Sequence, residues 1–152
     1  MLKGIDPLLS PELLTVLAEM GHGDELAIVD ANFPAVTMAR RLVRVGSPAP
    51  DVLRAVLTLL PLDDFVDVPL TVMEVVGRPD EIPEPVRDFQ AVANAAEDKH
   101  VKMTRIDRFS FYDRARAAFA VVASGELKPV SYTHLDVYKR QVWTIMLRTR
   151  SR

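Results

Sequence analysis

The chain has 152 residues, is 49% hydrophobic and 26% charged, and contains no cysteine, so it fits one soluble domain and excludes disulfides and cysteine-based zinc sites. The missing cysteines suit a reducing cytoplasm, and no apolar run approaches the ~20 residues that cross a bilayer, so we expect a cytoplasmic protein without a membrane partner. Residues 1–124 hold 13 Lys/Arg and 19 Asp/Glu, a net charge of −6 that argues against a nucleic-acid partner, whereas residues 125–152 hold 6 and 2, a net of +4.

The first predicted element is a helix that begins after Ser10. Ser10 can cap it, Pro11 suits the first helical position, and Gly21 can take the left-handed conformation that ends a helix. The short apolar run at 26–29 predicts a buried strand. Residues 35–46 are ambiguous between a solvated arginine face and a strand.

The rest of the body alternates helices and strands. We expect a helix opening at 48–51 and ending at Leu60, a strand over 68–76, a helix over 85–96, a strand over 101–106, a helix capped by Ser110, and an apolar strand over 119–123. This alternation predicts an α/β layered domain with a mixed or largely parallel sheet.

Between these elements, Asp63, Asp64 and Asp67 form an acidic loop, which we interpret as a solvated turn rather than a metal site because no histidine lies near it in sequence.

Three residues are candidates for chemistry. His22 lies between two glycines that permit close approach of a ligand, and imidazole exchanges protons near neutral pH, although a structural role fits equally well. Asp30 follows the strand at 26–29, where it either caps a turn or accepts hydrogen bonds from sugar hydroxyls. Arg108 either joins an exposed ion-pair cluster with Arg105 and Asp107, or faces a cleft at a strand end.

Two separated blocks carry a resemblance to a known family. Residues 17–25 read LAEMGHGDE and continue as DANFPA from Asp30, and residues 105–112 read RIDRFSFY. These blocks, with the flanking stretches up to about residue 129, resemble bacterial L-fucose mutarotases, which belong with D-ribose pyranases in the RbsD/FucU family.

The resemblance implies an enzyme that interconverts the α and β anomers of a free pyranose, most closely L-fucose, without metal or other cofactor. His22 matches the family's proton donor, and Asp30 and Arg108 match its sugar-binding positions. A three-layer α/β/α domain is implied, assembled into homo-oligomeric rings, often decamers, with sites near subunit interfaces. A ribose-type pyranase and a non-catalytic sugar-binding protein are the alternatives.

The end of the chain departs from the family pattern. The family continues with a Tyr-x-Asn segment that contacts sugar and then a final strand, whereas residues 130–141 resemble translated adapter or vector sequence. Tyr132 has different neighbours from the family tyrosine and is not equated with it. We therefore predict a domain over 1–129 that lacks its last strand, with a non-native tail over 130–152, and a destabilised protein of weak or no activity. A frameshift or a true variant tail is the alternative.

Overall fold

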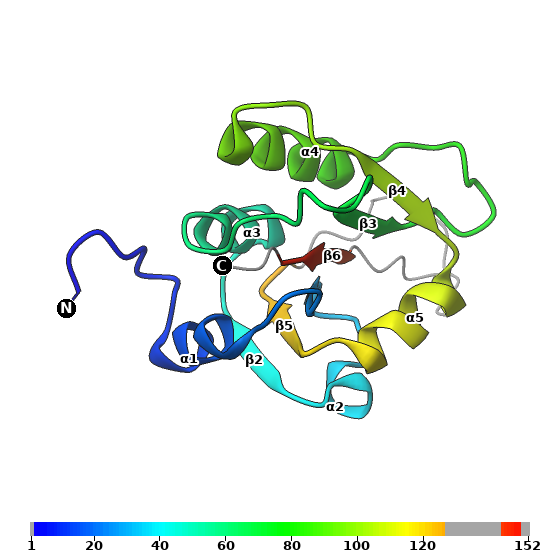
Figure 1. The fold of residues 1–152 in the computed structure, drawn as a ribbon. Helices are drawn as coiled ribbons and strands as arrows, with labels where there is room; N and C mark the ends of the chain where they lie inside the picture. Colours follow the sequence, from blue (N-terminus) through cyan, green and yellow to red (C-terminus); the bar gives the residue numbers. More distant parts are fainter. Residues whose placement is uncertain (1, 127–143, 150–152) are drawn as a thin grey trace.

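One six-stranded sheet organises the molecule in the computed structural model, which describes residues 2–126 and 144–149 (Figure 1). The strands are β1 (Glu25–Val29), β2 (Leu42–Val45), β3 (Leu70–Met73), β4 (Met103–Ile106), β5 (Ala120–Ser124) and β6 (Thr144–Arg148). Their order across the sheet is β2-β5-β1-β6-β3-β4. Every neighbouring pair is parallel except those of β6, which runs antiparallel to both β1 and β3. The prediction of a mixed sheet is thus confirmed.

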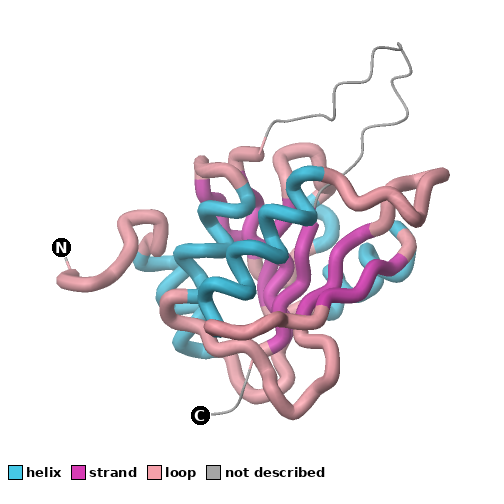
Figure 2. The backbone as a smooth tube through the Cα atoms, turned by 90° about the horizontal axis from the view of Figure 1, so that it is seen from above, coloured by secondary structure: helices cyan, strands magenta, loops and turns pink. Residues whose placement is uncertain are grey.

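Helices cover both faces of this sheet (Figure 2). They are α1 (Pro11–Glu19), α2 (Ala35–Met38), α3 (Ala49–Leu57), α4 (Glu84–Glu97) and α5 (Arg108–Ala117). Side chains of α1, α3 and α4 share one hydrophobic core with the sheet, and those of α2 and α5 share a second core on the opposite face. This arrangement confirms the three-layer α/β/α fold. None of the described helices is long and apolar enough to cross a membrane.

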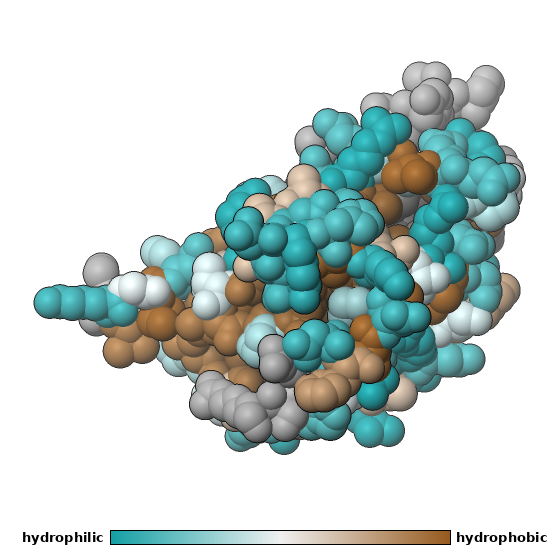
Figure 3. Space-filling view, turned by 45° about the horizontal axis from the view of Figure 1, so that its top comes forward, coloured by the Kyte–Doolittle hydropathy of each residue, from teal (hydrophilic) through white to brown (hydrophobic). Residues whose placement is uncertain are grey.

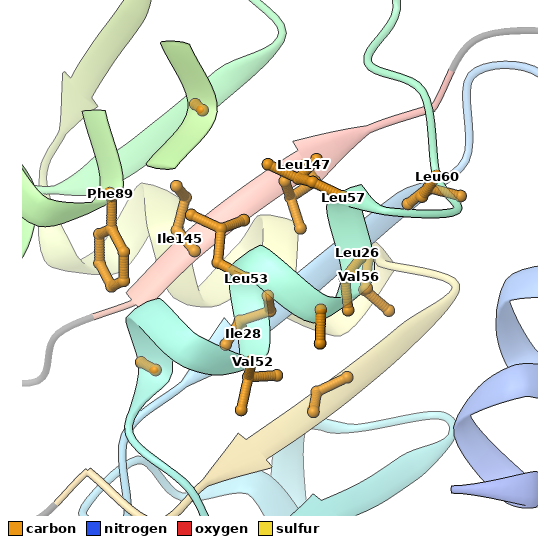
Figure 4. Close-up of a cluster of buried hydrophobic side chains, with 14 of the residues drawn as sticks. Leu26, Ile28, Val52, Leu53, Val56, Leu57, Leu60, Phe89, Ile145 and Leu147 are labelled. Atoms are coloured by element: carbon orange, nitrogen blue, oxygen red, sulfur yellow. The ribbon is translucent and has the colours of Figure 1, made fainter. Parts of the chain in front are cut away.

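The central strands are apolar along their whole length because helices bury both of their faces. Residues 26–29 of β1 are all fully buried. On the α3 side, Leu53 points toward Ile145 and Leu147 of β6 (Figure 4). On the other side, Arg114 of α5 pairs with Glu25 and donates to the Thr71 hydroxyl at 2.8 Å, which ties α5 to the sheet.

Local details differ from the sequence-based expectations. The ambiguous stretch at 35–46 holds both a short helix, α2, and an edge strand, β2. The helix expected to be capped by Ser110 begins earlier, at Arg108. Asp107 caps it, because its carboxylate accepts from the backbone N–H groups of Phe109 (2.9 Å) and Ser110 (3.1 Å).

The prediction that the final strand is missing is wrong. Residues 144–148 form β6, which fills the position between β1 and β3, where an absent strand would leave two rows of backbone hydrogen-bonding groups unpaired. Residues 142–147 read VWTIML, an apolar run interrupted only by Thr144, but the run lies among basic residues in a stretch without a clear pattern, so the sequence did not predict the strand. Residues 130–143 and 150–152, including Tyr132, lie outside the described residues, and the foreign origin of the tail stays a prediction.

Candidate active site

The predicted site residues lie at two opposite edges of the sheet. Because β6 is antiparallel to both β1 and β3, the other five strands all point the same way, and their carboxyl ends share one edge. Asp30 follows β1 and Arg108 follows β4, so both lie at this carboxyl edge. His22 precedes β1 and lies at the amino edge. The five residues of β1 span about 17 Å at ~3.3 Å per residue, so one chain brings Asp30 and Arg108 to the same edge and leaves His22 at the other.

Asp30 is the buried acidic group of the carboxyl edge. It is 2% exposed, and its Oδ1 accepts from the backbone N–H of Asn32 at 2.6 Å. Burial raises the pKa of the Tyr112 phenol; the positive charge of Arg108 opposes this increase and the negative charge of Asp30 adds to it. The three side chains therefore share one electrostatic neighbourhood, and the Tyr112 ring is held edge-on against Phe33 at 5.2 Å between centroids.

Arg108 stands in the first turn of α5, where its guanidinium carbon lies 5.0 Å from the centroid of the Phe109 ring. Both residues line a hollow of about 300 Å³ beside the residues that follow β3. The alternative of an ion-pair cluster finds no support in the described contacts. Arg105 donates instead to the Pro79 carbonyl at 2.6 Å, and Asp107 caps α5.

Thr144 is a residue of this edge that sequence reasoning missed. It stands opposite Val29 in the ladder of β1 and β6, one position from Asp30. Its side chain is 1% exposed, and its hydroxyl has no hydrogen-bond partner among the described residues. A buried hydroxyl without a hydrogen-bond partner costs free energy, so Thr144 is an unusual residue of this edge. The apolar residues on both sides of Thr144 were the signal that the sequence offered.

At the amino edge, His22 is exposed on a tight turn between α1 and β1. Gly23 has a φ of +80°, a conformation that glycine adopts without strain. The His22 ring meets the Phe65 ring edge-on, with centroids 6.1 Å apart. Beside it lies a hollow of about 560 Å³, lined mainly by apolar side chains of α1 and of the loop after α3, such as Leu14 and Leu59. Hydrophobic surface gathers next to the amino-terminal arm (Figure 3).

The acidic loop is only partly the solvated turn that the sequence suggested. Asp67 fits that description, since its side chain is 92% exposed and pairs with Lys102 at 3.3 Å. Asp63 does not, because it is 1% exposed and its Oδ2 lies 3.2 Å from Nε of Arg148. The partner of Asp63 comes from β6, more than eighty residues away in sequence, so no local pattern could reveal its burial.

Similar proteins point to one family. The model of the RbsD / FucU transport protein family matches residues 3–136. An L-fucose mutarotase of Actinobacillus pleuropneumoniae is 43% identical over 128 residues, 84% of this chain and 89% of the relative. The human fucose mutarotase is 45% identical over 132 residues, 82% of this chain and 85% of the relative.

A solved structure agrees with these relatives. The fucose mutarotase of Streptococcus pneumoniae, determined in complex with L-fucose, superposes with a TM-score of 0.82 at 34% identity and covers 99% of both chains. The similarity thus extends over most of the chain in sequence and over nearly all of it in structure. The chain belongs to the RbsD/FucU family.

Proposed function

We propose that the protein is a sugar mutarotase that interconverts the α and β anomers of a free pyranose, with L-fucose as the substrate. The observation that carries this proposal is the similarity, over most of both chains, to relatives named as fucose mutarotases. The ribose-type alternative is less well supported, because the close relatives and the superposed structure named above are all fucose enzymes. The absence of cysteine supports a cytoplasmic location as part of the same proposal.

The reaction needs only proton transfers. A base removes the proton from the anomeric hydroxyl, the bond between the anomeric carbon and the ring oxygen breaks, and the ring oxygen takes up a proton. The aldehyde then rotates about its bond to the next carbon, and the reverse steps close the ring on the other face. One acid/base side chain contributes about 10²- to 10⁴-fold to such a step. His22 supplies that group in our proposal, since imidazole both gives and takes protons near neutral pH.

The carboxyl edge supplies the groups that orient the sugar. Asp30 accepts hydrogen bonds from hydroxyls, and the Arg108 guanidinium donates them. The Tyr112 phenol lies near both residues and can donate a further hydrogen bond. The exposed ring of Phe109, which lies beside the Arg108 guanidinium, offers the apolar surface that a pyranose ring face contacts.

The distance between the two edges supports a site that two copies of the chain form together. A pyranose is much shorter than the ~17 Å length of β1, so it cannot touch His22 and Asp30 of the same chain. We therefore propose that His22 of one copy faces the Asp30 edge of its neighbour. Head-to-tail contacts close into a ring when the rotation between successive copies completes a full turn, and the family resemblance implies such rings. The apolar hollow beside His22 supports this arrangement, because it exposes hydrophobic surface next to the proposed junction.

Saturation-transfer proton NMR of L-fucose with a catalytic amount of the protein tests the proposal. We expect faster exchange between the α and β signals, and an exchange about 10²-fold slower in His22→Ala. D-ribose in the same assay tests the alternative substrate. Binding of L-fucose without faster exchange would favour the non-catalytic sugar-binding alternative, and unchanged exchange in His22→Ala would remove His22 from the mechanism.

A further inference from the structure

The turn that carries His22 is held by residues distant in the sequence. The Thr149 hydroxyl donates to the Gly21 carbonyl at 2.7 Å, and the Gly23 N–H donates to the Thr149 carbonyl at 3.3 Å. Thr149 directly follows β6, so the backbone on both sides of His22 is fastened to the end of the central strand. These contacts fix the backbone of the turn.

Arg148 covers one side of this turn. A methyl group added to Gly23 would lie 3.4 Å from Nη2 of Arg148, which places the guanidinium directly over the residue after His22. The Arg148 side chain is 40% exposed, so it needs an anchor to hold one position. Asp63 is that anchor, with its Oδ2 3.2 Å from Nε of Arg148, and its backbone N–H donates to the Arg148 carbonyl at 3.0 Å.

Asp63 also determines where Phe65 lies. Its Oδ1 accepts from the backbone N–H of Phe65 at 3.0 Å, which closes a tight turn and directs the Phe65 ring toward His22. The two rings meet edge-on, with an interplanar angle of 88°. Phe65 is 76% exposed, so burial in the core does not account for an aromatic residue at this place. A buried carboxylate is costly without partners. Asp63 has one on each oxygen: Oδ1 accepts from the Phe65 N–H, and Oδ2 lies at ion-pair distance from the Arg148 guanidinium without a hydrogen bond to it.

We propose that Asp63 is a positioning residue for His22, which acts through Arg148 on one side of the turn and through Phe65 on the other. This inference rests on the proposed function, in which His22 transfers the protons. Misplacement of a reacting group by about 1 Å can slow a reaction 10²-fold while the substrate still binds. The network therefore governs kcat, and the sugar-orienting groups at the other edge govern KM.

Asp63→Asn is the primary test, because the amide oxygen can still accept from Phe65 while the charge that holds Arg148 is lost. We expect kcat for fucose anomer exchange to fall about 10-fold or more with KM changed less than about 2-fold. Asp67→Asn is the matched control, since it makes the same substitution in the same loop and breaks an exposed pair with Lys102. It should match the unsubstituted protein. Equal kcat values in the two variants would overturn the proposal.

Substitution of Phe65 tests the ring contact with His22 without changing a buried charge. Phe65→Leu removes an exposed ring, so its melting temperature should stay unchanged while kcat falls. Phe65→Tyr keeps the ring and should retain the kcat of the unsubstituted protein. A kcat in Phe65→Leu equal to that in Phe65→Tyr would exclude the ring contact from the positioning of His22.

The His22 ring signals in a carbon–proton correlation NMR spectrum separate this inference from the proposed function. Asp63→Asn and Phe65→Leu should each shift the His22 signals, and Asp67→Asn should not. If the unsubstituted protein does not accelerate exchange, the proposed function fails, and these signals alone decide the positioning. Unshifted His22 signals in both Asp63→Asn and Phe65→Leu would overturn it.

Discussion

Tyr112 shows how a single side chain acquires a role from its surroundings. Burial raises the pKa of its phenol, and Asp30 adds to this rise against the opposing charge of Arg108. The phenol therefore stays protonated through neutral and mildly alkaline pH and remains a hydrogen-bond donor. The sequence shows Tyr112 only as one residue of a motif. It reveals neither the burial of the side chain nor the residues that lie near it in the fold.

We expect Tyr112→Phe to raise the KM for L-fucose with little change in kcat. The variant keeps the ring and its contact with Phe33 but loses the hydroxyl. A lost hydrogen bond of about 1.4 kcal/mol corresponds to about a 10-fold weaker binding. The KM comes from exchange rates measured over a range of fucose concentrations. A KM equal to that of the unsubstituted protein would mean that the phenol makes no bond to the sugar.

Asp107 gives a prediction about pH and stability. The Ser110 hydroxyl is the main cause that lowers the pKa of this carboxyl, and backbone N–H groups at the start of α5 add to it. A carboxyl whose pKa is lower in the folded state stabilises the protein above its unfolded pKa of about 3.9. That contribution is lost as the pH falls through the lowered folded value.

We therefore expect Asp107→Ala to unfold at a lower urea concentration than the unsubstituted protein at neutral pH. The difference between the two midpoints should shrink as the pH falls below about 3.9, because the Asp107 carboxyl becomes protonated first in the unfolded state and then, at lower pH, in the folded state. Urea unfolding, monitored by circular dichroism at a series of pH values, measures the two midpoints. A difference that stays constant with pH would show that the cap does not depend on the charge of Asp107.

Among the elements, β6 has the largest influence on both the fold and the candidate site. It pairs with β1 on one side and β3 on the other, and so joins the two parallel halves of the sheet. Its first residue, Thr144, lies beside the Asp30 edge, and its last residue, Arg148, lies over the His22 turn. One strand of five residues thus contributes to both proposed half-sites.

We expect Ile145→Ala to lower the free energy of unfolding by about 2–5 kcal/mol. Ile145 is fully buried and lies in register with Ile28 of β1 and Val72 of β3, so the truncation leaves a cavity between the sheet and its helices. Val36→Ala on α2 is the control, because that side chain is 73% exposed. Urea denaturation of both variants gives the comparison. If Ile145→Ala lowered the free energy of unfolding no more than Val36→Ala does, β6 would not be a central element of the core.

At the scale of the whole molecule, the two edges of the sheet make a test of the shared site possible. His22→Ala removes the acid/base group at one edge, and Asp30→Asn removes the carboxylate at the other. Each variant alone should have little activity. If the site combines His22 of one copy with Asp30 of the next, an equal mixture assembled together should regain function in about a quarter of its shared sites.

Co-expression of the two variants, followed by the same NMR exchange assay, measures this recovery. The separately purified variants, mixed without reassembly, are the control for contamination. Exchange in the co-expressed sample no faster than in the variants alone would show that His22 and Asp30 do not act from different copies on one sugar.

Apart from residues 35–46, which stayed ambiguous, the sequence by itself determined the order of the elements from residue 11 to residue 124, because helix periodicity, capping residues and buried apolar runs are local signals. It also predicted His22, Asp30 and Arg108 as site residues, through motifs that lie on single turns or strand ends, and their roles stay a proposal. Its errors concern elements with weak local signals. The cap of α5 moved from Ser110 to Asp107, a shift of three residues, and β6 was missed altogether.

Only the tertiary structure decided which of these residues lie together. Asp63 is buried because Arg148 reaches it from a strand far along the chain, and Thr144 joins the Asp30 edge because β6 is inserted antiparallel beside β1. The separation of His22 from Asp30 follows from the length of β1 and the common direction of its parallel neighbours. Such long-range pairings depend on strand order and register, which are set by the packing of the whole sheet. A local stretch of sequence therefore does not predict them.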